Sequence, residues 1–239
     1  MKALKADFSL QKKILFNANL FGNFQNQKEI QTVKELLLEL DIVADYLPPE
    51  HMKSVVLQSV NININHLPTS EVMIQKRIQS RYDRPFLTVS FMGSSETAGA
   101  LRDVGMVMGL RQSETERVIR QGLAFVTNGI NHYGAELYRK KAYLLLNGYY
   151  SEIIGRILDD LGMVVVSPPD KTHYPTPEAL QHLIKECGID LIVGDDNQVF
   201  TNTGKTPYLS LSNVNESFLC FKGFINLAHC ITRVIKENH

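Results

Sequence analysis

The chain has 239 residues, 44% of them hydrophobic, which is enough for one large domain or two smaller ones with substantial cores. Lys plus Arg and Asp plus Glu both number 25, so the net charge is zero and the basic surface of a nucleic-acid-binding protein is missing. No apolar run approaches the roughly 20 residues that cross a bilayer. The charged start, Met1–Asp7, precedes no apolar signal-peptide core. We therefore expect a cytoplasmic protein without nucleic-acid or membrane partners.

The first half of the sequence alternates between apolar strands and amphipathic helices. The helix over residues 27–40 repeats apolar residues at helical spacing on one face. Residues 60–66 alternate apolar and polar, which indicates a strand, and Thr69 or Ser70 suits the N-cap of the helix that follows. The expected strands are 13–20, 42–47, 60–66 and 86–91, and the expected helices are 27–40, 70–82 and 96–109.

Residues 112–140 contain no convincing strand and mix charged with apolar residues, so we expect helices that bridge two halves. Gly129 and Gly134 are expected to break them, because glycine is unfavourable inside a helix. The second half then repeats the first pattern. Its expected strands are 142–146, 163–166, 189–193 and 207–211, and its expected helices are one that ends at Gly162, one opened by Thr176-Pro177-Glu178, and a last one over 221–236.

Strands alternating with helices of this length build parallel sheets, which bind ligands at the carboxyl ends of their strands. The predicted fold class is therefore α/β, with two Rossmann-like parallel-sheet lobes joined by helices. The expected domains are residues 1–110, a helical connector over 111–140, and residues 141–239 with a closing C-terminal helix.

Two loops at expected carboxyl ends are candidate ligand sites in the first lobe. Ser94, Ser95, Glu96 and Thr97 precede a helix and could hold an anion, such as a carboxylate of a tetrapyrrole; helix capping by Ser94 or Ser95 explains the same residues. His66 ends a strand and could ligate a metal or move a proton, or it could be an ordinary hydrogen-bonded loop histidine.

In the second lobe, Asn147, Gly148, Tyr149 and Tyr150 fill the first strand–helix turn. Gly148 allows a close approach of the backbone, and either tyrosine could stack on a planar ligand or simply cover the sheet edge. The loop 194–197 carries Asp195 and Asp196, which could share a proton or bind a hard cation, or could be solvated loop acids.

The cysteines are far apart and form no CxxC pair. Cys187, Cys220 and Cys230 are expected to be buried free thiols, since cysteine is among the most buried residue types. An iron–sulfur cluster held by one chain normally takes four thiolates, which this sequence does not have.

Four segments resemble the nitrogenase component 1 superfamily, which includes nitrogenase iron–molybdenum subunits, their cofactor-assembly scaffolds and dark-operative protochlorophyllide reductase. The resemblance lies in the order and spacing of these segments and implies a fold similar to that of chelatases and nitrogenase subunits. They are residues 13–47, Arg84–Gly93 with Glu96-Thr97, residues 147–165, and Gly188–Gly194 with Phe221–Phe224.

The sequence departs from this family at the cofactor ligands. Family subunits usually have three α/β domains, of which this chain resembles the last two and lacks the one that supplies cluster cysteines. The family's cofactor cysteine falls near Asn65–Pro68 and its cofactor histidine near Phe218–Cys220, so His66 and Cys220 become candidate metal ligands. In nitrogenase an arginine that contacts the cofactor lies at the position where this sequence has Tyr149-Tyr150. We therefore expect neither an iron–molybdenum cofactor nor dinitrogen reduction.

The resemblance implies a component of a nitrogenase-like oxidoreductase that is not an enzyme on its own. It would form a homo- or hetero-oligomer with a cysteine-bearing chain, share with it an iron–sulfur or other metal cofactor or a tetrapyrrole, and receive electrons from an ATP-dependent iron–sulfur reductase. The alternative is an intracellular carrier or cofactor-assembly scaffold for a metal complex or tetrapyrrole. The substrate is not identified by the sequence.

Overall fold

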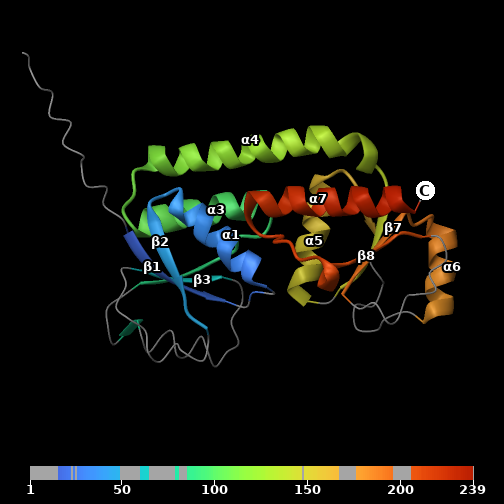
Figure 1. Cartoon of the computed structure of the whole chain (residues 1–239), viewed down its shortest axis with the longest axis horizontal. Helices are drawn as coiled ribbons and strands as arrows, with labels where there is room; N and C mark the ends of the chain where they lie inside the picture. The colour runs from blue at the N-terminus through green and yellow to red at the C-terminus, as the bar shows by residue number, and fades with distance from the viewer. Residues whose placement is uncertain are drawn as a thin grey trace, which may run out of the picture.

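Two parallel four-stranded sheets form two lobes, which are joined by long helices (Figure 1). The computed structural model describes residues 16–22, 24, 26–48, 60–64, 79–80, 85–146, 148–166, 176–195 and 206–238. The predicted α/β fold class with two parallel-sheet lobes is confirmed. The domain boundaries at residues 110 and 140 stay predictions.

The first lobe has strand order β2-β1-β3-β4, all parallel. Asn26 caps helix α1 by accepting a hydrogen bond from the backbone N–H of Glu29 at 3.1 Å, which fixes the start of this helix. The elements are β1 (Phe16–Gly22), α1 (Gln27–Leu38), β2 (Ile42–Tyr46), β3 (Val60–Ile64), β4 (Phe86–Val89) and α3 (Gly93–Val107).

The second lobe repeats this arrangement with the order β6-β5-β7-β8. Thr176 caps α6 and Pro177 occupies its first position, as predicted. Gly188 ends that helix at φ 62°, and Gly162 follows α5 at φ 75°. The elements are β5 (Lys141–Leu145), α5 (Gly148–Asp160), β6 (Val164–Val166), α6 (Pro177–Cys187), β7 (Leu191–Gly194) and β8 (Tyr208–Ser210).

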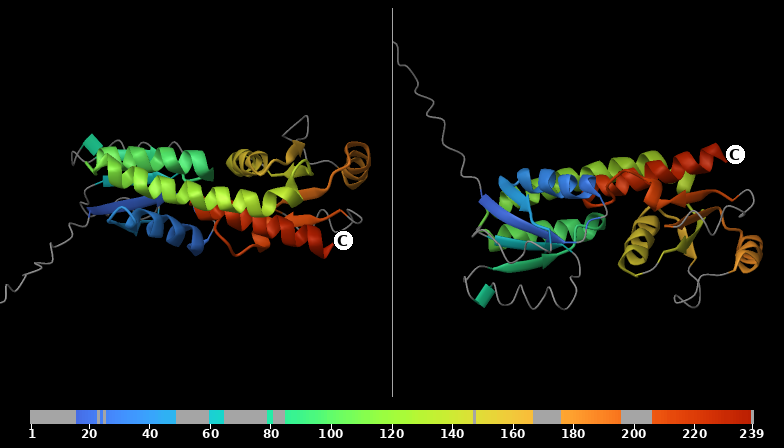
Figure 2. Two further views of the ribbon diagram at one scale, coloured as in Figure 1. Left: turned by 90° about the horizontal axis from the view of Figure 1, so that it is seen from above. Right: turned by 60° about the horizontal axis from the view of Figure 1, so that its bottom comes forward.

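Helices α4 (Gln112–Leu137) and α7 (Cys220–Glu237) lie side by side and extend along both lobes (Figure 2). The expected breaks at Gly129 and Gly134 are wrong, because α4 is one continuous helix of 26 residues. Gly129 serves close packing instead: a Cβ there would lie 1.8 Å from Cδ1 of Ile225. At Gly122, a Cβ would lie 2.1 Å from Cδ2 of Phe221.

Strand β3 is buried on both faces. Its apolar and polar residues alternate as predicted, yet Asn61 and Asn63 are buried as fully as their apolar neighbours. Nδ2 of Asn19 on β1 donates a hydrogen bond to Oδ1 of Asn61 at 2.9 Å, so the two amides pair inside the sheet. A central strand of a parallel sheet has helices on both faces, which removes the solvated face that such alternation usually marks.

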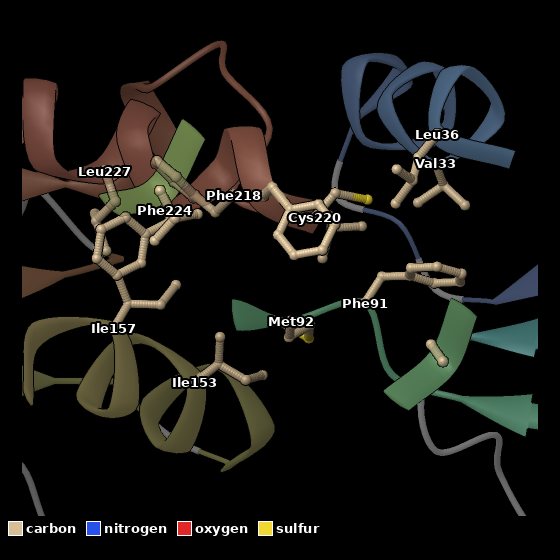
Figure 3. Packing of buried hydrophobic residues seen from close by; sticks show 14 of the residues in the cluster. Val33, Leu36, Phe91, Met92, Ile153, Ile157, Phe218, Cys220, Phe224 and Leu227 are labelled. Carbon is tan, nitrogen blue, oxygen red and sulfur yellow. The ribbon is translucent and has the colours of Figure 1, made fainter. Parts of the chain in front are cut away.

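A single hydrophobic cluster joins the two lobes (Figure 3). Ile153 and Ile157 of α5 face Phe224 and Leu227 of α7, and Phe218 lies beside them. The Met92 backbone forms an antiparallel bridge with Leu219, which ties the end of the first sheet to the start of α7.

The remaining predicted elements differ from the structure mainly at their ends. Helix α3 begins at Gly93 instead of residue 96, and α5 begins at Gly148, inside the expected strand–helix turn 147–150. The expected helix 70–82 lies outside the described residues except for residues 79–80, which are helical. No helix among the described residues has the length and apolar character to cross a membrane.

Candidate functional site

A polar cavity of about 530 Å³ lies where the lobes meet, beside the carboxyl ends of β7 and β8 and the start of α1. Open α/β sheets bind ligands at this edge. The cavity is lined by Asn26, Asp195, Leu211, Ser212, Asn213, Val214 and Asn215. Five of these residues, 211–215, belong to the segment that leads from β8 towards α7.

This connecting segment, residues 211–219, is held by both lobes. In the second lobe, the Ser212 hydroxyl donates to the backbone carbonyl of Asp195. In the first lobe, Lys28 forms an ion pair with Glu216 at 3.0 Å, and Nδ2 of Asn26 donates to the Glu216 carbonyl at 3.4 Å. The segment therefore forms one wall of the cavity, and contacts with both lobes fix the position of this wall.

The polar side chains that line the cavity can both donate and accept hydrogen bonds. Asn26, Asn213 and Asn215 can each donate and accept, and the Ser212 hydroxyl can do the same. Burial raises the pKa of the Asp195 carboxyl, which favours its protonated form relative to a solvated aspartate. Among the described lining residues none is basic. Such a lining suits a polar ligand better than a strongly anionic one.

The residues predicted to hold an anion lie at the start of α3. Capping by Ser94 or Ser95 is wrong, because the N-cap is Met92 and no side chain caps the helix. The Thr97 hydroxyl donates to the Gly93 carbonyl at 2.6 Å and is buried. Glu96 forms an ion pair with Arg156 of α5, so this helix start contacts the second lobe. Ligand binding by these four residues stays a prediction.

Three other predicted sites lie wholly or partly outside the described residues. His66 and Asn147 lie outside them, as does Asp196 of the expected pair with Asp195. Gly148, Tyr149 and Tyr150 form the first turn of α5, where a loop was expected. Their backbone therefore lies at a helix start after the carboxyl end of β5, the edge where open α/β sheets generally bind ligands.

Cys220 begins α7 with a φ of 61°, and its backbone N–H donates to the Phe91 carbonyl at 2.6 Å. Its side chain is buried between Phe91 and Leu36 of α1 (Figure 3). Burial raises the pKa of this thiol well above its usual range. The described residues contain no group of three or more metal-binding side chains. As a metal ligand, Cys220 stays a prediction.

The expected burial of all three cysteines is confirmed for Cys220 and Cys230 but not for Cys187, which is half-buried at the end of α6.

Sequence reasoning missed most of the cavity wall. Asn26 and the run Ser212–Asn215 each follow a strand of a parallel sheet, and this placement was the available signal. The run was overlooked because it contains no histidine, cysteine or glycine-rich motif.

Three comparisons place this fold among known proteins. The family model described as nitrogenase component 1 type oxidoreductase matches residues 10–168. The nitrogenase molybdenum-iron protein alpha chain of Methanothermococcus thermolithotrophicus is 23% identical over 77% of this chain and 40% of its own length. The nitrogenase iron-molybdenum cofactor biosynthesis protein NifE of Klebsiella pneumoniae is 25% identical over 91% of this chain and 54% of its own length.

A solved nitrogenase structure, Cp1 at pH 6.5, has a similar fold, with a TM-score of 0.72 and 14% identity over 93% of this chain and 58% of the other. The chain thus spans about half the length of the curated relatives it matches. Because the family model covers more than half of the sequence, the chain belongs to the nitrogenase component 1 type oxidoreductase family.

Proposed function

We propose that the chain is a ligand-holding component of a nitrogenase-like oxidoreductase, and that a cysteine-bearing partner chain supplies the iron–sulfur centre. The observation that carries this proposal is the polar cavity between the lobes, formed jointly by the start of α1, the end of β7 and residues 211–215. The chain spans about half the length of the curated relatives that it matches.

The cavity would hold a polar group of a metal cofactor or a tetrapyrrole shared with the partner. His66, the Ser94–Thr97 helix start and the Asn147–Tyr150 turn would complete the site at the same edges of the two sheets. His66 and Cys220 are the candidate metal ligands. An ATP-dependent iron–sulfur reductase would be the electron donor, as in this family, and the complex would act in the cytoplasm.

The site supports hydrogen bonding and positioning, because its described lining offers amides, a hydroxyl and one carboxyl group. Asp195 is the one carboxyl group in the described lining, and partial burial raises its pKa above that of a solvated aspartate. Any electron-transfer chemistry would come from the bound cofactor and from the partner.

The test is native mass spectrometry of the full chain purified anaerobically from its own host, with iron measured in the same sample. We expect a complex with a cysteine-rich chain that contains iron. Asn213→Trp, which fills the cavity, should release the ligand, whereas Asn131→Trp on the exposed face of α4 should not. A chain that stays monomeric and free of ligand under these conditions overturns the proposal.

A second candidate function is a cofactor-assembly scaffold or carrier. It is favoured by the match to NifE, a cofactor biosynthesis protein, which extends over 91% of this chain. In this case the purified chain would carry a metal complex or tetrapyrrole by itself or as a self-dimer. In both cases Cys220→Ser tests whether Cys220 is a metal ligand. Loss of metal with the fold intact assigns Cys220 as a ligand, and unchanged metal content removes it from the candidates.

A further inference from the structure

A pocket of about 290 Å³ lies where helices α1, α4 and α7 meet. Its lining comes from the second half of α1 with its C-cap, the middle of α4 and the first turn of α7. Among the described lining residues, none is shared with the cavity between the lobes. The pocket is therefore separate from the candidate site described above.

The inner surface of this pocket is apolar. Leu36, Val118 and Phe221 are buried side chains from three different helices. Cys220 also lines the pocket, and its sulfur points towards α1 beside Leu36 (Figure 3). Gly122 lets the ring of Phe221 lie against the backbone of α4, since a Cβ there would lie 2.1 Å from Cδ2 of the ring. The floor thus offers an aromatic ring and aliphatic groups to a ligand.

Phe125 adds a second aromatic ring to the lining, and its side chain is 47% exposed. A ligand that covers this ring would remove apolar surface from water, which favours binding. The size of the pocket limits the ligand. An apolar protein cavity of about 150 Å³ holds benzene, and this pocket has nearly twice that volume. An apolar body as large as a bicyclic aromatic ring system therefore fits.

The charges in the lining are unequal. Nζ of Lys222 lies 2.9 Å from Oε2 of Glu35, so these two charges offset each other. Glu39 supplies a second carboxylate, which forms no ion pair or hydrogen bond among the described residues. Arg117 contacts only the backbone carbonyl of Glu39, at 3.4 Å. The lining therefore has one negative charge that its positive charge does not offset.

The charge of Glu39 acts inside the pocket. Burial is the main cause that raises the pKa of the Cys220 thiol; Lys222 opposes this shift, and the negative charges of Glu29 and Glu39 add to it. A carboxylate that disfavours a thiolate in the pocket floor favours a positive charge there. The faces of aromatic rings such as Phe125 also attract cations.

We propose that this pocket binds a small organic cation, an amine on an apolar body no larger than a bicyclic aromatic ring system. The body lies on Phe125 and Phe221, and the ammonium group lies beside Glu39. An anionic ligand of the same size is disfavoured, because it would meet this carboxylate. No residue of the cavity between the lobes takes part, so the proposal is independent of the proposed function.

Probes that share a bicyclic body test the class of ligand: 1-naphthylmethylamine, 1-naphthylmethanol and 1-naphthoate. Naphthalene fluorescence reports their binding to the full chain at pH 7, since the chain has no tryptophan. We expect the amine to bind about tenfold more tightly than the alcohol, because its ammonium gains the Glu39 carboxylate and the aromatic faces. Naphthoate should bind most weakly. Equal affinities, tightest binding of naphthoate, or no binding of any probe at about 1 mM overturns the proposal.

A charge substitution tests where the ammonium group lies. Glu39→Gln should lower the affinity for the amine about tenfold and leave that for the alcohol unchanged, because only the amine uses the carboxylate. The matched control is Glu114→Gln in the first turn of α4, outside the pocket lining, which should change neither affinity. An effect of Glu39→Gln that equals the effect of its control overturns the proposal.

A second substitution tests where the apolar body lies. Phe125→Ala removes an exposed ring from the pocket and should weaken the amine and the alcohol alike, by about tenfold. Leu123→Ala removes an exposed apolar side chain of the same helix that does not line the pocket, so both affinities should stay unchanged. Binding that is insensitive to Phe125→Ala, or equally sensitive to both substitutions, would place the probes elsewhere and overturn the proposal.

Discussion

The contact between α4 and α7 and the cavity between the lobes are built in opposite ways. In the helix pair, glycines remove side chains so that Phe221 and Ile225 can reach the neighbouring backbone. In the cavity, Ser212, Asn213 and Asn215 contribute polar side chains to an open space of about 530 Å³. The first region holds the two lobes together by close packing, and the second leaves hydrogen-bonding groups for a ligand.

This difference separates residues that determine stability from residues that determine binding. A close-packed contact fails when volume is added, because protein interiors have few voids. A polar cavity accepts changes of size with little loss of stability, since its side chains are not packed on all sides. Substitutions in the two regions should therefore differ in how much they change the free energy of unfolding.

Gly223→Ala should have the largest effect. A Cβ at this position would lie 2.0 Å from the carbonyl carbon of Phe218, a backbone atom that cannot turn away. We expect a loss of about 3 kcal/mol or more, the upper range for overpacking, which corresponds to roughly 6–12 °C in Tm for a chain of this size. Thermal unfolding followed by circular dichroism measures it.

The control is Gly99→Ala in α3, where a Cβ would meet no atom within 4 Å. Here the helical preference of alanine should stabilise the chain by about 0.5–1 kcal/mol. Equal destabilisation by both substitutions would contradict a packing role specific to Gly223.

Asn61→Leu should have the next largest effect. It removes the acceptor for Nδ2 of Asn19 inside the first sheet, and a buried polar group that loses its partner costs about 1–3 kcal/mol. Urea unfolding measures this loss. In the double variant Asn19→Leu/Asn61→Leu, both polar groups are gone, so the loss should be smaller than the sum of the two single losses. An additive result would mean that the two amides do not act as a pair.

Asn213→Ala is the counterpart in the cavity. Because Asn213 lines an open space, its truncation should change the free energy of unfolding by at most about 0.5 kcal/mol. A loss as large as that of Asn61→Leu would remove the distinction between the buried amides of the sheet and the amides of the site.

The same distinction explains how much could be predicted from the sequence. Hydrophobic periodicity identified both parallel-sheet lobes, since apolar faces determine which elements pack. Glycine was misread at Gly129, because a glycine that allows another helix to approach looks in sequence like one that ends a helix. Asn61 and Asn63 were read as one side of an alternating strand, whereas helices bury both sides of a central strand.

The site was harder to predict than the fold. Residues Ser212–Asn215 line the cavity because the connection between the lobes brings them close to Asn26. These residues are distant from Asn26 in the sequence, so no local pattern marks the site. The start of α3 was placed three residues late because Met92, which has no capping side chain, precedes it. Backbone contacts such as the bridge between Met92 and Leu219 have no signature in the sequence.

The ion pair between Glu96 and Arg156 should contribute much less than the packing. It joins α3 to α5 across the lobes, but Arg156 is 62% exposed and solvent screens the pair. A double-mutant cycle with Glu96→Gln and Arg156→Gln should give a coupling of about 0.2–1 kcal/mol that decreases in high salt. A coupling above this range would mean that charge, and not the shared core, holds the lobes together.

The smallest effect is expected at the surface contact between α1 and the start of α7. A hydrogen bond from Lys222 at 2.9 Å is the main cause that lowers the pKa of Glu35 below its ordinary value of 4.5, and Gln31 adds to it. A carboxyl group whose pKa is lower in the folded state stabilises the fold above its unfolded pKa. This contribution is lost as the pH falls through the folded value.

Both side chains are about half-exposed, 60% for Lys222 and 47% for Glu35, so screening limits this contribution to a few tenths of a kcal/mol. Lys222→Gln should therefore be slightly less stable than the wild type at pH 7, and the difference should shrink as the pH falls through the lowered pKa of Glu35 and its carboxylate becomes protonated. Urea unfolding over a series of pH values measures it, and 1 M salt at pH 7 should abolish most of the difference. A difference that stays constant as the pH falls would show that Lys222 acts through packing at the start of α7, which would extend the close-packed region to the surface.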